Sequence, residues 1–200
     1  MRNHLSENDM LRELWDREQI REVIARYCRA IDRAMVDDAK RVYFEDATED
    51  HGVYRGLAQE FVSFLTGLLT DEYIGHHCLG QTLIDLEGDT ARCETYFVCG
   101  MAWNQPGSPL EFADVRGRYI DTMDRRNGEW RIESRVAVLD ITQQRSMDPE
   151  WDIAAEFIRG RRYPDDLVFH PDELRARVDL TAPRPADRPA ARKAQDKCLN

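Results

Sequence analysis

Hydrophobic positions recur with a helical period in the stretch from Glu18 to Met35. Residues three and four apart share one face of a helix, so this spacing predicts an amphipathic helix with one buried side. Asp32 lies at the edge of the apolar arc, where a carboxylate is either solvated, as most charges are, or directed into a cavity beside the core. The apolar positions are Ile20, Val23, Ile24, Tyr27, Cys28 and Ile31.

Two further helices are predicted before the pattern changes. The stretch 36–47 has the composition of a short second helix, and 45–54 follows as a short strand or an irregular arm. From Leu57 to Leu69 the helical period returns and predicts a third amphipathic helix. The apolar positions of this helix are Leu57, Phe61, Phe64, Leu65, Leu68 and Leu69.

After Tyr73 apolar and polar residues alternate, which is the pattern of β-strands with one buried face. Turn signals separate the strands, and the clearest is Asn127-Gly128, because both residues tolerate the positive φ of a tight hairpin. Long strands joined by short turns predict an antiparallel meander. The four predicted strands are 74–86, 90–103, 111–125 and 130–142.

Helices followed by a long sheet predict an α+β fold, here a cone-shaped α+β barrel in which N-terminal helices lie over the concave face of a curved antiparallel sheet. Long strands curl and a few helices do not fill the concavity, so we expect a cavity for one apolar small molecule. Residues 1–160 are predicted to form this domain, with a last helix at 148–160. Residues 161–200, rich in Pro and Arg, are predicted to be a C-terminal arm and a disordered tail.

Composition and charge exclude several functions. The net charge of −10 argues against a nucleic-acid partner, and no apolar run approaches the ~20 residues of a membrane span. The N-terminus has no apolar signal segment, so we expect a cytoplasmic protein. The five cysteines include no C-x-x-C pair, and no nucleotide or metalloprotease motif occurs, so no cofactor and no metal are expected. The acidic cluster at 46–51 is interpreted as a solvated loop.

His76, His77 and Arg135 are the first candidates for chemistry. Alternation directs the two histidines to opposite faces of a strand, so at most one reaches the cavity, and their diverging rings suit a metal poorly. A histidine on a strand is more often structural than catalytic. Arg135 is predicted to lie on the strand face opposite to Ile132. On that face it either forms an ion pair at the rim of the cavity or binds developing negative charge.

A further set of side chains is predicted to face the interior from the second and third long strands and from the third helix. Such a set is an adequate wall for an apolar ligand, and equally an ordinary core. The six residues assigned to substrate binding are Phe61, Phe64, Phe97, Met101, Tyr119 and Asp121.

Three segments together resemble the SnoaL-like branch of the nuclear transport factor 2-like superfamily. They are Tyr27–Asp32 at the end of the helix, His77–Gly80 at the start of a strand, and the turn Asn127–Trp130 followed by Arg135. The resemblance covers residues 10–160 and extends to scytalone dehydratase, bile acid 7α-dehydratase and hexachlorocyclohexane dehydrochlorinase. It implies a small molecule enclosed in the cone and an Asp–His pair that removes a proton while a leaving group departs.

The resemblance implies catalytic roles for four residues. Asp32 falls on the helix aspartate of the pair and His77 on the strand histidine, which as a neutral imidazole acts as the base. The carboxylate fixes the tautomer of that imidazole and stabilises its charged form. Tyr27 and Arg135 fall on a proton donor and on a group that stabilises negative charge. The second histidine of scytalone dehydratase corresponds to Met101 here, which leaves the leaving-group chemistry open.

The sequence therefore predicts a cofactor-independent lyase that acts on a hydrophobic hydroxylated ring or aryl compound, as in aromatic or steroid catabolism. The reaction is elimination of water or C–C cleavage that releases a small carbonyl such as formaldehyde. A non-catalytic module for ligand binding or subunit assembly, and a ketosteroid-isomerase-like isomerase, are the alternatives. The resemblance also implies a homo-oligomer, either a trimer or a dimer. Neither the substrate nor the leaving group follows from the sequence.

Overall fold

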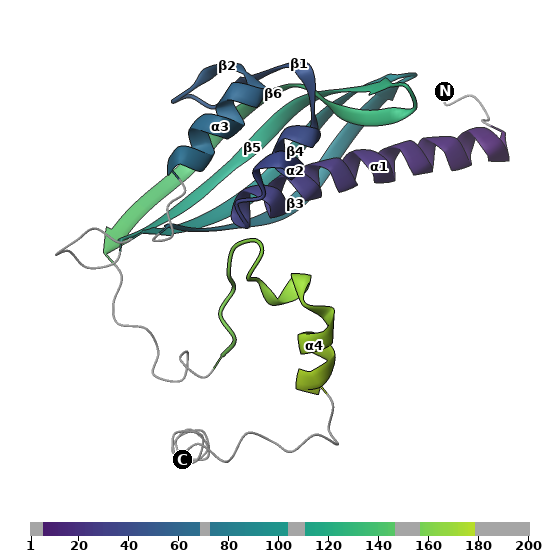
Figure 1. Ribbon diagram of the computed structural model, residues 1–200. Helices are drawn as coiled ribbons and strands as arrows, with labels where there is room; N and C mark the ends of the chain where they lie inside the picture. Colours follow the sequence, from purple (N-terminus) through teal and green to yellow (C-terminus); the bar gives the residue numbers. More distant parts are fainter. Residues whose placement is uncertain (1–5, 69–72, 104–110, 147–156, 179–200) are drawn as a thin grey trace, which may run out of the picture. The chain divides into compact units, whose positions relative to one another are not determined.

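The computed structural model describes residues 6–68, 73–103, 111–146 and 157–178 (Figure 1). The chain forms two compact units, residues 1–146 and 147–200, which are described separately. Among the described residues, no helix is both long and apolar enough to cross a membrane.

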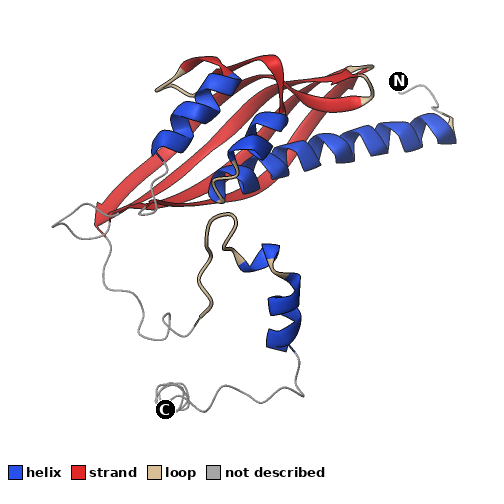
Figure 2. Cartoon of the chain, in the orientation of Figure 1, coloured by secondary structure: helices blue, strands red, loops and turns tan. Residues whose placement is uncertain are grey.

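In the first unit, three helices cover one face of a six-stranded sheet (Figures 1 and 2). This confirms the predicted α+β fold. The long strands and the third helix lie within a few residues of their predicted bounds, whereas the first helix starts at Glu7 rather than Glu18 and the second ends at Arg41 rather than at residue 47. The elements are α1 (Glu7–Asp32), α2 (Val36–Arg41), β1 (Tyr43–Asp50), β2 (Arg55–Leu57), α3 (Ala58–Leu68), β3 (Tyr73–Glu87), β4 (Thr90–Trp103), β5 (Glu111–Arg126) and β6 (Glu129–Ser146).

The order of strands in the sheet is β2-β1-β6-β5-β4-β3. Strands β3 to β6 form the predicted antiparallel meander. Strand β1 lies beside the last strand, β6, and pairs with it in parallel, while β2 pairs antiparallel with β1. The sheet is therefore mixed rather than purely antiparallel, because β1 joins the meander at its far edge and runs in the direction of β6.

Helix α1 is fixed at its start and again in its middle. The Ser6 side chain accepts a hydrogen bond from the backbone N–H of Asp9, which caps the first turn. One carboxylate oxygen of the buried Asp16 accepts hydrogen bonds from Trp130 Nε1 and Arg125 Nη1, each at 2.9 Å. These bonds attach the helix to the β5–β6 hairpin. The apolar residues that the helix buries are Ile20, Ile24, Tyr27, Cys28, Ala30 and Ile31.

A bulge in β6 corrects the predicted faces of that strand. Thr122 pairs with Ser134 but Met123 pairs with Ile132, so Glu133 is an extra residue in β6. The alternation therefore shifts by one residue, and Ile132 and Arg135 are both buried instead of facing opposite sides. The hairpin turn between β5 and β6 is the predicted one, with positive φ at Asn127 (55°) and Gly128 (82°).

Arg135 is a fully buried cation in the core. Its Nε and Nη2 donate to the two carboxylate oxygens of Asp121 at 2.7 and 2.8 Å, and both side chains have no exposed surface. The guanidinium carbon lies 4.3 Å from the ring centroid of Tyr27 and 4.1 Å from that of Tyr119. Paired hydrogen bonds and aromatic faces compensate for the loss of water around the charge.

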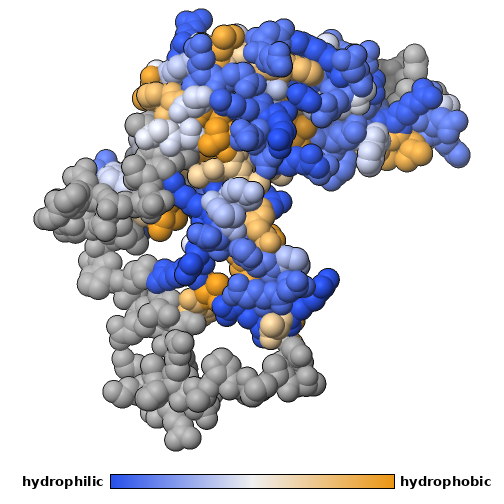
Figure 3. Space-filling view, viewed as in Figure 1, coloured by the Kyte–Doolittle hydropathy of each residue, from blue (hydrophilic) through white to orange (hydrophobic). Residues whose placement is uncertain are grey.

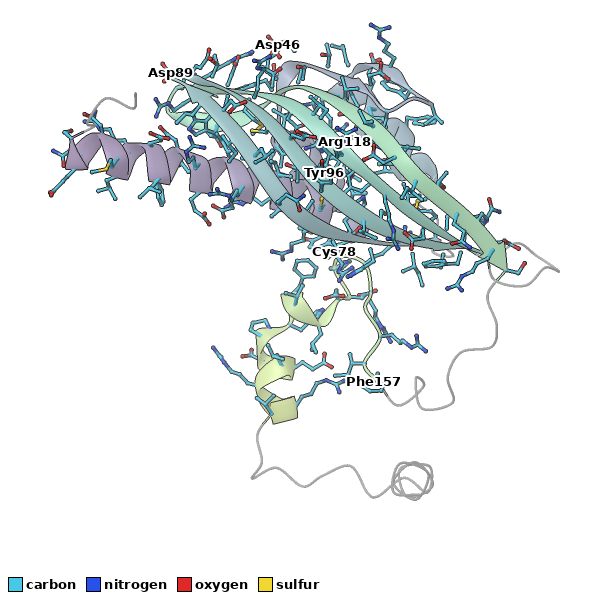
Figure 4. All side chains as sticks on the ribbon, turned by 180° about the vertical axis from the view of Figure 1, so that it is seen from behind. Asp46, Cys78, Asp89, Tyr96, Arg118 and Phe157 are labelled. Carbon is cyan, nitrogen blue, oxygen red and sulfur yellow. The ribbon has the colours of Figure 1, made fainter. Side chains whose placement is uncertain are left out.

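The surface of the first unit is largely hydrophilic on the side of the helices (Figure 3). An apolar patch lies on the N-terminal part of α1, where Leu11, Leu14 and Trp15 are exposed. The opposite face of the sheet, seen in Figure 4, carries Tyr96 and Arg118. Arg118 bridges Glu94 and Asp140 across three strands.

The second unit contains a 3-10 turn, η2 (Leu167–Phe169), and a short helix, α4 (Pro171–Val178). Asp166 connects the preceding loop to the start of η2 by accepting hydrogen bonds from the backbone N–H groups of Arg161 and Val168. Most of the predicted helix 148–160 lies outside the described residues, and its last four residues are not helical. Helix α4 falls in the stretch for which we expected only an arm.

We expect replacement of Asp121, the buried partner of Arg135, to lower the free energy of unfolding strongly. Asp121→Asn leaves a buried guanidinium without its counter-charge, which typically costs about 3–5 kcal/mol of folding free energy. Asp140→Asn, which removes a partner of Arg118 at the surface, serves as the control and costs roughly 1 kcal/mol or less. Urea unfolding of both variants measures the difference, and equal losses would contradict this view of the core.

Candidate functional site

Asp32 and His77 form a tightly held pair between α1 and β3. Asp32 Oδ1 lies 2.6 Å from His77 Nδ1, and Asp32 Oδ2 accepts the backbone N–H of His77 at 2.9 Å. The two side chains are mostly buried, with 9% and 11% of their surfaces exposed. Both carboxylate oxygens are thus directed to one residue, which fixes the position and the orientation of the imidazole. The predicted pair is present.

The position of Asp32 is unfavourable for a carboxylate by local criteria. It is the last residue of α1, where the partial negative charge of the helix end disfavours an acid. Ala34 has a positive φ of 54°, and the backbone N–H of Met35 returns to the Ala30 carbonyl, which turns the chain away after Asp32. The two bonds to His77 therefore hold the acid in place at the helix end.

His77 faces inward while its neighbour His76 is exposed, as alternation requires. The direct cross-strand partner of His77 on β4 is Cys99, which is buried on the same face. Burial by itself lowers the pKa of His77. The hydrogen bonds to Asp32 and Cys99 outweigh this effect and raise the pKa to about 9. The pair therefore stabilises the imidazolium, and the neutral imidazole, which can accept a proton, becomes populated as the pH approaches 9. Because Asp32 occupies Nδ1, Nε2 is the nitrogen left for proton exchange with a substrate.

A cleft of about 330 Å³ lies beside this pair, between the last turns of α1 and the start of β3. Its rim includes Arg29, Arg33 and His76, so it is polar and basic on one side. The lining residues are Ala25, Cys28, Arg29, Asp32, Arg33, His76, His77 and Leu79.

The other two predicted catalytic residues lie together in the core. Tyr27 packs edge-on against Tyr119 and lies against the Arg135 guanidinium, and burial raises the pKa of its phenol far above the usual range. Arg135 binds Asp121, as described above. One guanidinium nitrogen, Arg135 Nη1, is buried without a hydrogen-bond partner among the described residues. The structure thus brings Tyr27, Tyr119, Asp121 and Arg135 into one cluster.

Phe97 connects this cluster to the Asp32–His77 pair. Its ring stacks on Tyr119 at 4.3 Å between centroids and lies 6.2 Å from the His77 ring. Phe61 is fully buried, and Met101 is partly buried against the core. Phe64 is 41% exposed and stacks on Tyr54, so its side chain is not part of the buried core.

The sequence interpretation missed the buried Glu49 and its partly exposed partner His51. Glu49 and His51, which were assigned to a solvated loop, lie on and just after β1, and the Glu49 side chain is completely buried. The available signal was the spacing of Ala47, Glu49 and His51, which alternation places on one face. Among the described residues, no group of three or more His, Cys, Asp or Glu side chains is arranged to hold a metal ion.

Comparison with known proteins identifies the family. A model of the SnoaL-like domain matches residues 12–136. The chain belongs to the SnoaL-like domain family. This confirms the resemblance inferred from the sequence. An uncharacterized protein of Mycobacterium tuberculosis is 28% identical to this SnoaL-like protein over 134 residues, which cover 62% of this chain and 85% of the relative.

Solved structures share the fold of the SnoaL-like domain. A hexachlorocyclohexane dehydrochlorinase aligns with a TM-score of 0.62 at 14% identity, covering 70% of this chain and 97% of that chain. A putative scytalone dehydratase from Novosphingobium aromaticivorans aligns with a TM-score of 0.59 at 17% identity, covering 68% and 94%. A nuclear transport factor 2-like protein from the same species is 25% identical, with a TM-score of 0.54 and coverage of 70% and 91%.

The pKa of His77 predicts a pH-dependent contribution to stability. Because the folded-state pKa is raised from 6.5 to about 9, the contribution is fully present below pH 6.5 and is lost as the pH rises to about 9. Its size is on the order of 3 kcal/mol. In urea unfolding, the difference in free energy of unfolding between wild type and His77→Gln should shrink over this interval. His76→Gln is the exposed control, and a difference independent of pH would refute the assignment.

Proposed function

We propose that this SnoaL-like protein is a cofactor-independent lyase that uses the Asp32–His77 pair as its base. The observation that carries the proposal is that the Asp32 carboxylate accepts two hydrogen bonds from His77, one from the ring and one from the backbone N–H. A carboxylate on Nδ1 fixes the tautomer that exposes Nε2 and stabilises the imidazolium formed when a proton is taken from carbon. The dehydratase and the dehydrochlorinase among the solved structures of this fold support a reaction of the elimination type.

The proposed substrate is a hydrophobic hydroxylated ring or aryl compound, and the proposed reaction is loss of water. C–C cleavage that releases a small carbonyl starts from the same proton transfer and is the second possibility within this class. The apolar lining of the cleft beside the pair, which includes Ala25, Cys28 and Leu79, supports an apolar ring as the ligand.

The interior also supports stabilisation of negative charge. A buried donor without a partner is costly, so an oxygen atom placed at Arg135 Nη1 gains a strong, charge-assisted hydrogen bond. In the proposed reaction an oxygen of the substrate or of the developing enolate accepts this hydrogen bond. Tyr27 lies against the same guanidinium and keeps its phenolic proton because its pKa is raised by burial.

Two other functions use the same fold. The packing of Phe61, Phe97 and Tyr119 in the core favours a non-catalytic module, because buried rings occupy part of the expected cavity. An isomerase would use the same base and return the proton to another carbon. Mass spectrometry of incubations with ring-hydroxylated steroids and aryl alcohols separates the three: a lyase product lacks one water or a small carbonyl, an isomer keeps the mass, and a module yields no product.

The pair is tested by three single variants assayed on the substrate that the screen identifies. His77→Ala should lower kcat by about 10²- to 10⁴-fold, the usual contribution of general acid–base catalysis. Asp32→Asn should cause a loss of similar order, because the amide neither fixes the tautomer nor stabilises the imidazolium. His76→Ala changes an adjacent exposed histidine and should retain near-wild-type kcat. Near-wild-type rates in both the His77 and the Asp32 variant would sink the proposal.

A further inference from the structure

The cleft of about 330 Å³ beside the Asp32–His77 pair has one apolar side and one cationic side. Arg29 and Arg33, from the end of α1, lie on the cationic side; Arg29 is exposed and Arg33 is half-buried. The exposed His76 of β3 lines the same side. A ligand in this cleft therefore meets two permanent positive charges next to the proposed base. The apolar side consists of Ala25, Cys28 and Leu79.

The pattern of charges along α1 changes where the helix reaches this cleft. Three earlier arginines each form an ion pair with a glutamate three or four residues before them. No acid stands at those positions for the two cleft arginines: Ala25 and Arg26 precede Arg29, and Arg29 and Ala30 precede Arg33. The helix therefore concentrates positive charge in its last turns instead of neutralising it locally. The three earlier pairs are Glu13–Arg17, Glu18–Arg21 and Glu22–Arg26.

The end of the helix accounts for only part of this arrangement. Arg29 lies in the last turn of α1 and Arg33 is its C-cap residue, and cations there stabilise the partial negative charge of the helix end. Two arginines one turn apart are also like-charge neighbours, however, and such a pair weakens a helix slightly. This repulsion is offset when both guanidinium groups bind the same anion. The arrangement therefore favours a ligand that carries negative charge.

The remaining charges of the cleft leave this positive charge in place. Among the described residues that line the cleft, Asp32 is the one acid, and both of its carboxylate oxygens accept hydrogen bonds from His77. Because the pKa of His77 is raised to about 9, the pair has no net charge at neutral pH. The lining is thus positive in a chain whose net charge of −10 otherwise repels anions. Each guanidinium has five N–H donors, so it can bind an anion in addition to its contacts within the protein.

We propose that Arg29 and Arg33 bind a carboxylate group of the substrate, and that the substrate is a small hydroxylated ring acid. This rests on the proposed lyase function. A guanidinium group recognises a planar carboxylate through paired hydrogen bonds, while the apolar side of the cleft accommodates the ring. A volume of about 330 Å³ is at the lower end for ligand sites and suits one or two rings. With its carboxylate held at the end of α1, the ring lies beside His77.

Two aromatic probes of the same shape test the carboxylate site without turnover. 2-Naphthoate carries the charge and 2-naphthamide is its neutral counterpart; NMR titration of the full chain, followed at the backbone amides of His77 and Leu79, gives both dissociation constants. Wild type should bind 2-naphthoate at least about tenfold more tightly, as expected for an added charge-assisted hydrogen bond. The double variant Arg29→Gln/Arg33→Gln should lose this preference but still bind 2-naphthamide, and each single variant should weaken it. Arg21→Gln, which removes a cation outside the cleft, should preserve it. Equal affinities of wild type for the two probes, or a preference that survives in the double variant, would overturn the proposal.

The probe experiment also keeps this proposal separable from the lyase function. His77→Ala should retain the preference for 2-naphthoate, since the arginines are unchanged. If this variant also keeps full activity, the lyase mechanism fails but the carboxylate site remains; if the lyase is active and wild type shows no preference, the carboxylate site alone is refuted. On the substrate that the screen identifies, Arg33→Gln should raise KM roughly tenfold and change kcat much less, because binding is weakened while the base is intact. An unchanged KM contradicts the proposed substrate class.

Discussion

The buried guanidinium of Arg135 is the interaction on which the interior of the SnoaL-like domain depends. It joins β6 to β5 through Asp121 and rests on Tyr27 of α1 and Tyr119 of β5, so one side chain connects the helix layer to the centre of the sheet. Such a charge is tolerated only where hydrogen bonds and aromatic faces replace water. The surroundings of Arg135 are consequently aromatic, with Tyr27, Tyr43 and Tyr119 around the guanidinium, whereas most of the remaining core is aliphatic.

This arrangement separates two kinds of buried carboxylate. Both carboxylate oxygens of Asp121 accept hydrogen bonds from Arg135, a cation that does not deprotonate in proteins. Glu49, on the other side of the same arginine, receives no bond from it and turns to Tyr43 and His51 instead. Because Arg135 pairs with Asp121, the Glu49 carboxylate is left to a phenol and an imidazole.

Periodicity predicted the elements of the first unit because each helix and strand buries one face, and burial of one face is what a periodic pattern records. It located Tyr119 and Asp121 on the inner face of β5 for the same reason. It failed at Arg135 because the bulge at Glu133 shifts the alternation, and a bulge formed by ordinary residues leaves no local signal. It also failed at Glu49, since an acidic stretch with few apolar residues does not reveal that Tyr43 and His51, at the start and just past the end of the same strand, supply the partners of the buried carboxylate. The contact of Asp32 with His77 came from family resemblance, because a carboxylate at the edge of an apolar arc fits both a solvated and a buried position.

The partners of the buried acids distinguish structural from chemical roles. Asp16 is held by Arg125 and Trp130, neither of which releases a proton near neutral pH, so this carboxylate acts as a fixed attachment between α1 and the β5–β6 hairpin. Asp32 is held by an imidazole at a helix end, where the partial negative charge of the helix disfavours an acid. An uncharged residue at this position would avoid that electrostatic penalty. Local preferences that a fold violates at a cost are expected at functional sites. An imidazole is the side chain whose charge changes near neutral pH, so a carboxylate placed at this cost beside His77 stabilises a proton that can move.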